Sequence, residues 1–135
     1  MKPSFEFHST YFNVTEPRDY FINPQCYGDD LAGWLIRKLT QAGIKATSEP
    51  QQEDFGWFFT SVVDDVEHRV IVGFQPNDIN EGDSWVGWIE PKIGLLRSLF
   101  ENRGRVLPQA VQIIDAILSS ASEITELKWS LNSEI

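Results

Sequence analysis

The clearest pattern along the chain is an amphipathic helix that begins at Asp29 or Asp30 and ends at Gly43. Its apolar residues recur at i, i+3, i+4, i+8 and i+11, the spacing that places them on one helical face. They are Leu31, Trp34, Leu35, Leu39 and Ala42. An aspartate at the start can accept hydrogen bonds from the free N–H groups of the first turn, and glycine readily takes the left-handed conformation that ends a helix.

A second apolar stripe predicts a helix closer to the C-terminus. Pro108 suits its first turn, because proline lacks the N–H that a helix start leaves unbonded. The apolar residues of this stripe are Val111, Ile114, Ile117, Leu118 and Ala121, with Ile113 at its edge. A shorter helix is expected over 93–100, followed by a loop over 101–106.

Runs of aromatic and β-branched residues predict six strands. They cover residues 5–12, 44–48, 55–63, 68–75, 84–90 and 124–129. The acidic turn 64–67 joins two of them into a hairpin, and 76–83 forms an acidic loop. With two amphipathic helices, these strands predict a single α+β domain over residues 1–135. The expected architecture is a two-layer sandwich, in which a mainly antiparallel sheet carries both helices on one face.

The strands at 55–63 and 84–90 carry aromatic residues on both of their faces. Within 84–90, for example, Trp85 and Trp88 point to opposite sides. If both helices cover one face of the sheet, the other face should be polar. Two interpretations stay open: the aromatic loop over 13–28 covers the second face, or that face is an exposed apolar patch that binds a partner.

The composition limits the chemistry that the chain can carry. At 135 residues, of which 41% are hydrophobic, the chain is long enough to bury its own core. A single cysteine, Cys26, excludes an internal disulfide and a multi-cysteine zinc site. Two histidines, His8 and His68, disfavour a histidine-rich metal centre. We therefore expect a domain of a reducing compartment that holds no metal and no cofactor.

Negative charge is concentrated in the middle of the chain. Residues 46–91 contain ten carboxylates and one base, Arg69, and so account for the whole net charge of −9 while the flanks cancel. A field of this sign repels nucleic acids and anionic membranes and favours basic partners. We therefore expect no direct nucleic-acid binding and no membrane association. A solvated surface that keeps the protein in solution is the simpler alternative explanation of the charge.

The first residues give the expected location. After Lys2 the chain reads PSFEFHSTYF, which lacks the apolar run of a signal peptide. The longest runs without charged or strongly polar residues, such as 70–74, are far too short to span a bilayer. We expect the protein to be cytoplasmic.

Several motifs resemble catalytic or metal-binding sites but have simpler structural explanations. The string YGDD at 27–30 matches the magnesium-binding motif of RNA-dependent polymerases, but here it introduces a helix, where an aspartate caps the first turn. The adjacent carboxylates Glu53-Asp54 and Asp64-Asp65 point apart on a strand or turn, which does not suit a pair that shares one substrate.

The remaining candidates for chemistry are isolated residues. The acidic loop around 78–83 lacks the spacing of an EF-hand. Cys26 is expected to be a small packed hydrophobe and His68 a surface residue. A Cys-His pair that forms only in the fold stays open as the alternative. The chain has no GxSxG, no HExxH and no glycine-rich phosphate loop. We expect no catalytic residues and a non-enzymatic protein.

One segment resembles a known pattern. Residues 21–59 are similar to a segment of small acidic bacterial proteins with the pattern GDDLAxWLxxxLxxxGxxxxxPxxEDxGW. The matching residues are Gly28, Asp29, Asp30, Leu31, Ala32, Trp34, Leu35, Leu39, Gly43, Pro50, Glu53, Asp54, Gly56 and Trp57. In size, acidity and tryptophan content the chain also resembles immunity proteins of polymorphic toxins. This second resemblance implies a bacterial protein antagonist and transfers no functional residue.

The leading hypothesis is a protein-binding domain that docks on a basic surface of a partner and blocks it. A toxin-immunity protein or a phage-encoded inhibitor of a defence nuclease acts in this way. Charge complementarity speeds association, and buried aromatic anchors prolong it. The expected charged rim consists of Glu53, Asp54, Asp64, Asp65, Asp78, Glu81 and Asp83, and the expected anchors are Trp57, Trp85 and Trp88.

Two alternatives stay open. A pocket between the sheet and the 13–28 loop would make the chain a small-molecule-binding or enzymatic domain. Its expected lining residues are Tyr11, Tyr20, Tyr27 and Cys26. In the other alternative, two copies of the chain form a homodimer by pairing their aromatic sheet faces.

Overall fold

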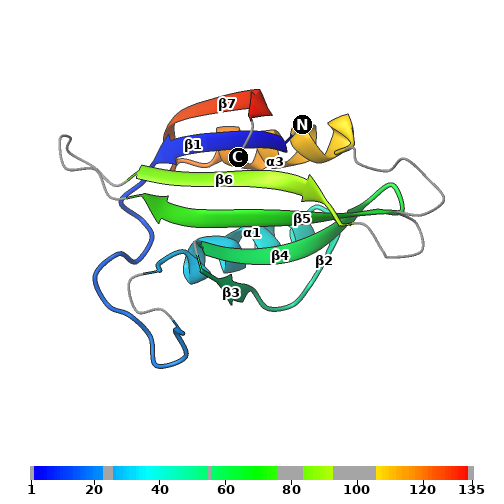
Figure 1. Ribbon diagram of the computed structural model, residues 1–135. Coiled ribbons are helices and arrows are strands. Elements are labelled where there is room, and N and C mark those ends of the chain that lie inside the picture. The colour runs from blue at the N-terminus through cyan, green and yellow to red at the C-terminus, as the bar shows by residue number, and fades with distance from the viewer. Residues whose placement is uncertain (1, 23–25, 55, 76–83, 93–105, 134–135) are drawn as a thin grey trace.

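A single seven-stranded β-sheet is the central element of the described part of the molecule (Figure 1). The computed structural model describes residues 2–22, 26–54, 56–75, 84–92 and 106–133. The strands are β1 (Lys2–His8), β2 (Lys45–Ala46), β3 (Gln51–Glu53), β4 (Gly56–Val63), β5 (Val66–Gln75), β6 (Ser84–Pro91) and β7 (Thr125–Ser133). They form one sheet in the spatial order β2-β4-β5-β6-β1-β7, with β3 also paired to β4, and every pairing is antiparallel.

Two described helices accompany the sheet, α1 (Asp29–Gln41) and α3 (Pro108–Ser120). Both agree closely with the helices that the apolar stripes predict, and the α+β class with a mainly antiparallel sheet is confirmed. The end of α1 is also confirmed, because Gly43 has a φ of 81°. The expected helix over 93–100 and the acidic loop over 76–83 lie outside the described residues.

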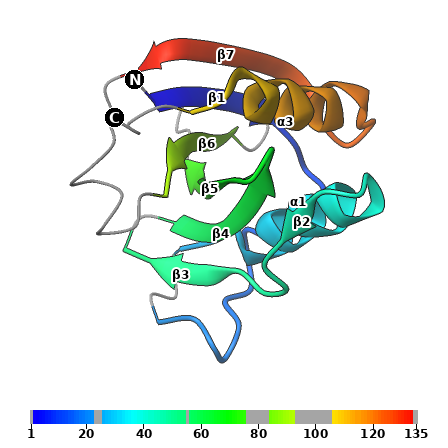
Figure 2. The same cartoon turned by 90° about the vertical axis from the view of Figure 1, so that its right-hand side faces the viewer.

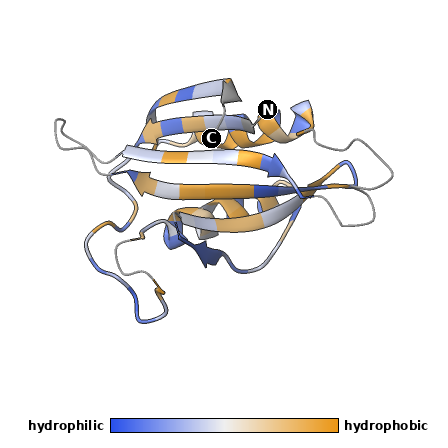
Figure 3. Cartoon of the chain, viewed as in Figure 1, coloured by the Kyte–Doolittle hydropathy of each residue, from blue (hydrophilic) through white to orange (hydrophobic). Residues whose placement is uncertain are grey.

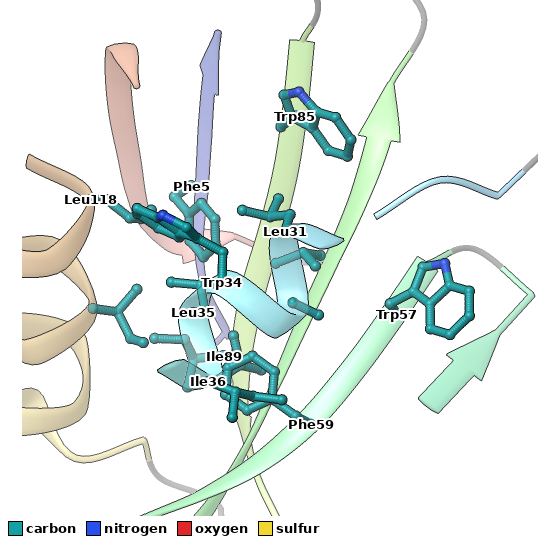
Figure 4. Close-up of a cluster of buried hydrophobic side chains, with 14 of the residues drawn as sticks. Phe5, Leu31, Trp34, Leu35, Ile36, Trp57, Phe59, Trp85, Ile89 and Leu118 are labelled. Atoms are coloured by element: carbon teal, nitrogen blue, oxygen red, sulfur yellow. The ribbon is translucent and has the colours of Figure 1, made fainter. Parts of the chain in front are cut away.

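The main core lies between the sheet and the two helices, which Figure 2 shows on the same side of the sheet. Alternate residues of the central strands point into it, and most of their apolar side chains are buried. The buried ones include Trp57 and Phe59 of β4, Val70 and Val72 of β5, and Trp85 and Ile89 of β6. The helices contribute Leu31, Leu35 and Leu118, which Figure 4 shows together with Phe59 and Ile89.

The aromatic loop over 13–28 extends this core and does not cover the opposite face of the sheet. The Phe21 ring lies 5.2 Å from the Trp57 ring, and the Tyr27 ring lies 6.1 Å from the Phe74 ring. Trp57 and Phe74 both point to the helix side. For the described part of the loop, the interpretation that it shields the second face is therefore wrong.

The start of α1 combines a predicted contact with two that the sequence did not indicate. Gly28, with a φ of 136°, is the N-cap and has no side chain to bond to the first turn. The Asp30 carboxylate accepts the expected hydrogen bond from a first-turn N–H, that of Leu31 (2.9 Å). It also accepts one from the Asn13 N–H (2.7 Å), and Asp29 accepts one from the Tyr20 hydroxyl. The two aspartates therefore fasten the 13–28 loop to the helix.

The predicted hairpin is confirmed as β4 and β5, with Asp64 and Asp65 between them. These two residues have φ values of 52° and 62°, which is the pattern of a two-residue turn that matches the twist of its strands. One strand was missed: β3 (Gln51–Glu53) contains no apolar residue, so neither alternation nor β-propensity marks it. It forms because β4 offers a pairing edge at Phe58 and Trp57.

His68 is the clearest correction to the sequence-based expectations, because it is 0% exposed and not a surface residue. Its Nε2 accepts a hydrogen bond from the Leu107 N–H (3.1 Å), so its Nδ1 carries the proton and donates to the Val66 carbonyl (3.1 Å). The ring thereby joins β5 to the residue just before α3. Burial lowers its pKa, and the hydrogen bond to Val66 opposes that effect.

We expect His68 to make the protein less stable in mild acid. Because its pKa is lower in the folded than in the unfolded chain, the unfolded chain binds more protons once the pH falls below about 6.5. The free energy of unfolding then drops by up to about 1.4 kcal/mol per pH unit. Denaturant titrations between pH 7.5 and 5.5 should show a steeper loss for the wild type than for His68→Gln. Parallel curves would contradict the assigned burial.

Gly87 and Gly33 form a matched pair for testing the core. A Cβ atom at Gly87 would lie 2.3 Å from Cζ of Phe5 and 2.7 Å from the Ile71 carbonyl, so Gly87→Ala should destabilise the fold by about 1 to 3 kcal/mol. At Gly33, inside α1, a Cβ would meet only the Arg37 guanidinium at 3.6 Å, so Gly33→Ala should stabilise by about 1 kcal/mol. Denaturant unfolding measures both, and effects of equal sign would refute this packing.

Candidate functional site

The structure separates the three tryptophans that were expected to anchor a partner. Trp85 is 0% exposed, and its indole N–H donates to the Ser9 carbonyl (3.2 Å). Trp57 is 4% exposed, and its indole N–H donates to the Cys26 carbonyl (2.8 Å). Neither indole can act as a surface anchor in the folded chain, which corrects that expectation. Trp88 alone lies on the face of the sheet that points away from the helices.

We call that face the open sheet face. It is formed by the alternate residues of the sheet that point away from α1 and α3. The strand registers place on it Ser4 and Glu6 of β1, Phe58 and Thr60 of β4, Arg69 and Ile71 of β5, Val86, Trp88 and Glu90 of β6, and Lys128 of β7. Figure 3 views the molecule from this side, with the sheet in front of the helices.

A row of apolar side chains crosses the open sheet face. Phe58, Ile71 and Trp88 are directly opposite one another on β4, β5 and β6. Phe58 and Trp88 are half-buried, whereas Ile71, between them, is only 1% exposed although it is not part of the main core. Two aromatic rings therefore flank an isoleucine on the side of the sheet that neither described helix covers.

Arg69 is neutralised on this face. Its guanidinium carbon lies 4.7 Å from the centre of the Phe58 ring, and its Nη1 lies 3.5 Å from a Glu53 carboxylate oxygen and 3.7 Å from one of Glu90. Each such half-exposed ion pair contributes at most about 1 kcal/mol. The single base of the acidic middle segment is thus held between two acids, and Glu53 is a partner of Arg69 rather than a free member of the charged rim.

The other expected rim residues that the structure describes, Asp54, Asp64 and Asp65, do not form one cluster. Asp54 is exposed next to β3, while Asp64 and Asp65 are exposed in the turn between β4 and β5. Asp78, Glu81 and Asp83 lie outside the described residues. The eight residues of β4 lie between Asp54 and the Asp64-Asp65 turn, so the described rim acids lie at opposite ends of that strand.

Next to Trp88 the open sheet face is hollowed. A groove of about 530 Å³ runs over β6, β1 and β7. Its lining includes Ser4, Glu6, Val86, Trp88, Lys128 and Ser130. The groove adds room for a partner's side chains beside the aromatic row.

A separate pocket lies between the 13–28 loop and β3, as one of the alternatives anticipated. Its volume is about 650 Å³. It is lined by Tyr20, Ile22, Asp29, Glu49, Pro50, Gln51, Gln52 and Trp57. Of the four residues expected to line it, only Tyr20 does so: Tyr27 and Cys26 are buried in the core, and Tyr11 is exposed elsewhere.

The titratable groups near this pocket do not form a catalytic pair. Burial and the hydrogen bond to Asp29 raise the pKa of Tyr20 to about 12, so the hydroxyl stays protonated at neutral pH. Burial likewise raises the pKa of the Cys26 thiol, which contacts the Glu53 carbonyl (3.7 Å). Both ring nitrogens of His68 are bonded to backbone groups, so His68 is not the base for Cys26.

Among the described residues, no group of three or more His, Cys, Asp or Glu side chains could hold a metal ion. Neither α1 nor α3, the two helices described, is long and apolar enough to cross a membrane. No protein-family model, no curated protein and no solved structure matches the chain. The resemblance of residues 21–59 to small acidic bacterial proteins therefore stays a prediction.

The positions that carry this resemblance have structural explanations. Gly28 and Gly56 allow close approach: a Cβ would lie 3.3 Å from the Trp57 ring at Gly28, and 2.3 Å from the Val72 carbonyl at Gly56. Asp30 fastens the loop to α1, and Trp57 fills the space beneath it. The residues of this pattern therefore lie where the 13–28 loop, α1 and β4 pack against one another. The pocket lies in the same region.

Proposed function

We propose that this chain is a small acidic protein-binding domain that inhibits or neutralises a partner by docking its open sheet face on a basic surface. The observation that carries the proposal is the aromatic row of Phe58 and Trp88, half-buried on the side of the sheet that neither described helix covers. The proposal takes the fold as a two-layer sandwich in which the helices form one layer and a partner covers the other face of the sheet. Immunity proteins and phage-encoded inhibitors are the classes of protein that it fits.

Charge supports a basic partner. The acidic segment 46–91 supplies β3, β4, β5 and β6, so the net charge of −9 is concentrated around the strands that carry the aromatic row. Electrostatic complementarity accelerates diffusional encounter, whereas desolvated aromatic side chains set the lifetime of a complex. Asp64 and Asp65, exposed at the end of the hairpin, are suited to the first of these roles, and Trp88 to the second.

A second candidate function is the binding of a small molecule, which the pocket of about 650 Å³ beside the 13–28 loop favours. A homodimer through the open sheet face is a variant of the main proposal in which the partner is a second copy of the chain. The net charge of −9 on each copy opposes that variant.

Capture from the native host at low salt tests the docking face. The tagged wild type should retain one basic protein in stoichiometric amount and release it as salt is raised. Trp88→Ala and Glu6→Arg should lose it, because one removes the anchor and the other places a cation on the open sheet face. Tyr11→Ala removes an exposed aromatic ring elsewhere and should retain it. Equal recovery with all four proteins, or no stoichiometric partner of the wild type, would overturn the proposal.

The turn between β4 and β5 gives a kinetic prediction. Asp64→Asn with Asp65→Asn removes two charges but keeps the turn, because asparagine tolerates the left-handed conformation. Association with the captured partner should slow by about two- to tenfold and depend less on salt, with little change in dissociation. Glu16→Gln with Asp19→Asn removes the same charge from the 13–28 loop and serves as the control. An association rate that falls equally in both double variants would show that only net charge matters.

A further inference from the structure

The pocket beside the 13–28 loop has the size and walls of a binding site. Its volume of about 650 Å³ falls within the range of about 300 to 1,000 Å³ that is common for sites of small ligands. It lies at the β3 edge of the sheet, on the side to which Trp57 points. Among the residues that the structure describes, it shares no lining residue with the groove on the open sheet face, so what it binds is independent of the proposed function.

Two aromatic rings form a corner of this pocket. The Tyr20 and Trp57 rings are nearly perpendicular, at 84°, with their centres 6.1 Å apart. Trp57 is buried behind the pocket, whereas Tyr20 is 61% exposed. The hydroxyl of Tyr20 is engaged by Asp29, which fixes the position of the ring. Electron-rich aromatic faces in this arrangement attract organic cations.

The charges on the described residues that line the pocket are all of one sign. Asp29 and Glu49 line it, and no lysine, arginine or histidine is among the described lining residues. Arg18, in the turn before Phe21, lies near enough to lower the pKa of Tyr20 slightly but is not part of the lining. The start of α1 contributes about half a positive charge, which the carboxylates of Asp29 and Asp30 outweigh.

Ile22 and Pro50 give the lining of the pocket an aliphatic part. Ile22 is 85% exposed, which is unusual for an isoleucine in a loop that is otherwise fastened to the core. The backbone N–H of Ile22 donates to the Gln52 side chain (2.6 Å), which holds the loop against β3. A ligand that contacts Ile22 and Pro50 needs an alkyl part in addition to its charged group.

We infer that this pocket binds an alkylguanidinium or alkylammonium group. The cationic head lies against Tyr20, Trp57 and the carboxylates of Asp29 and Glu49, and the alkyl chain crosses Ile22 and Pro50. Such a group belongs either to a free amine or guanidine or to an arginine or lysine side chain of a protein. The two sources share one recognition chemistry, and the experiment separates them.

Titration of the ¹⁵N-labelled chain with butylguanidinium and butylammonium tests the inference. The Trp57 indole N–H signal, assigned with Trp57→Phe, should shift with a dissociation constant on the order of millimolar, as expected for ligands of this size. Butylurea, which has the same shape as butylguanidinium but no charge, should bind at least tenfold more weakly. Equal shifts with butylurea, or no shift with any of these ligands, would overturn the inference.

Variants locate the interaction. Glu49→Gln and Tyr20→Ala, both at exposed positions, should each weaken butylguanidinium binding by about three- to tenfold, since each removes one favourable contact with the cation. Glu126→Gln removes one charge from β7, on a different part of the surface, and should leave the affinity within a factor of two. Loss of affinity that is equal in Glu49→Gln and Glu126→Gln would overturn the site assignment.

A further titration, with short peptides, identifies the source of the cation. Acetyl-Gly-Arg-Gly-amide should bind at least as tightly as butylguanidinium if a protein side chain enters the pocket, with the citrulline peptide as its neutral control. Binding of butylguanidinium without binding of the arginine peptide would assign the pocket to a free amine or guanidine. Both results support the cation site and differ only in what supplies the cation.

Discussion

The burial of Trp57 is the constraint on which the rest of the structure depends. Its indole is surrounded by Phe21 and Tyr20 of the loop, its N–H reaches the Cys26 carbonyl, and Gly28 passes close to its ring. A side chain of this size can be buried only if the loop, the start of α1 and β4 come together at one place. The same contacts form the inner wall of the pocket. The packing around Trp57 therefore produces both this part of the fold and a candidate binding site.

The sheet divides the molecule into two regions with different properties. On the helix side, aromatic and aliphatic residues are packed in the manner of an ordinary core. On the other side, the pairing of Phe58, Ile71 and Trp88 keeps an apolar row next to carboxylates, with Arg69 laid over Phe58. A stacked arginine covers part of an aromatic ring without removing it from the surface. The proposed docking face needs this property, because the ring must be partly shielded in the free protein and still be accessible to a partner.

Sequence periodicity determined more of the fold than of the site. The helices at 29–41 and 108–120 and the hairpin at 56–75 follow from repeating apolar positions and from two adjacent turn residues, which are local signals. Alternation also groups Trp57 with Phe59, and Trp85 with Ile89. Which face the helices cover depends on the whole chain, so local patterns could not separate the buried tryptophans from Trp88. β3 and the burial of His68 depend in the same way on distant residues, namely β4 and Leu107.

The place of β1 in the sheet has a consequence for how the chain folds. β1 lies between β6 and β7, so Ser4 pairs with Trp88 on one side and with Ser130 on the other. During synthesis, β1 leaves the ribosome long before either of these neighbours exists, and Phe5 and Phe7 have no strand beside them until then. Contacts between residues so far apart in sequence close late and slow the folding of small domains. The sheet is complete only once β1 is paired with both β6 and β7, the strands that are synthesised after it and that lie on either side of it.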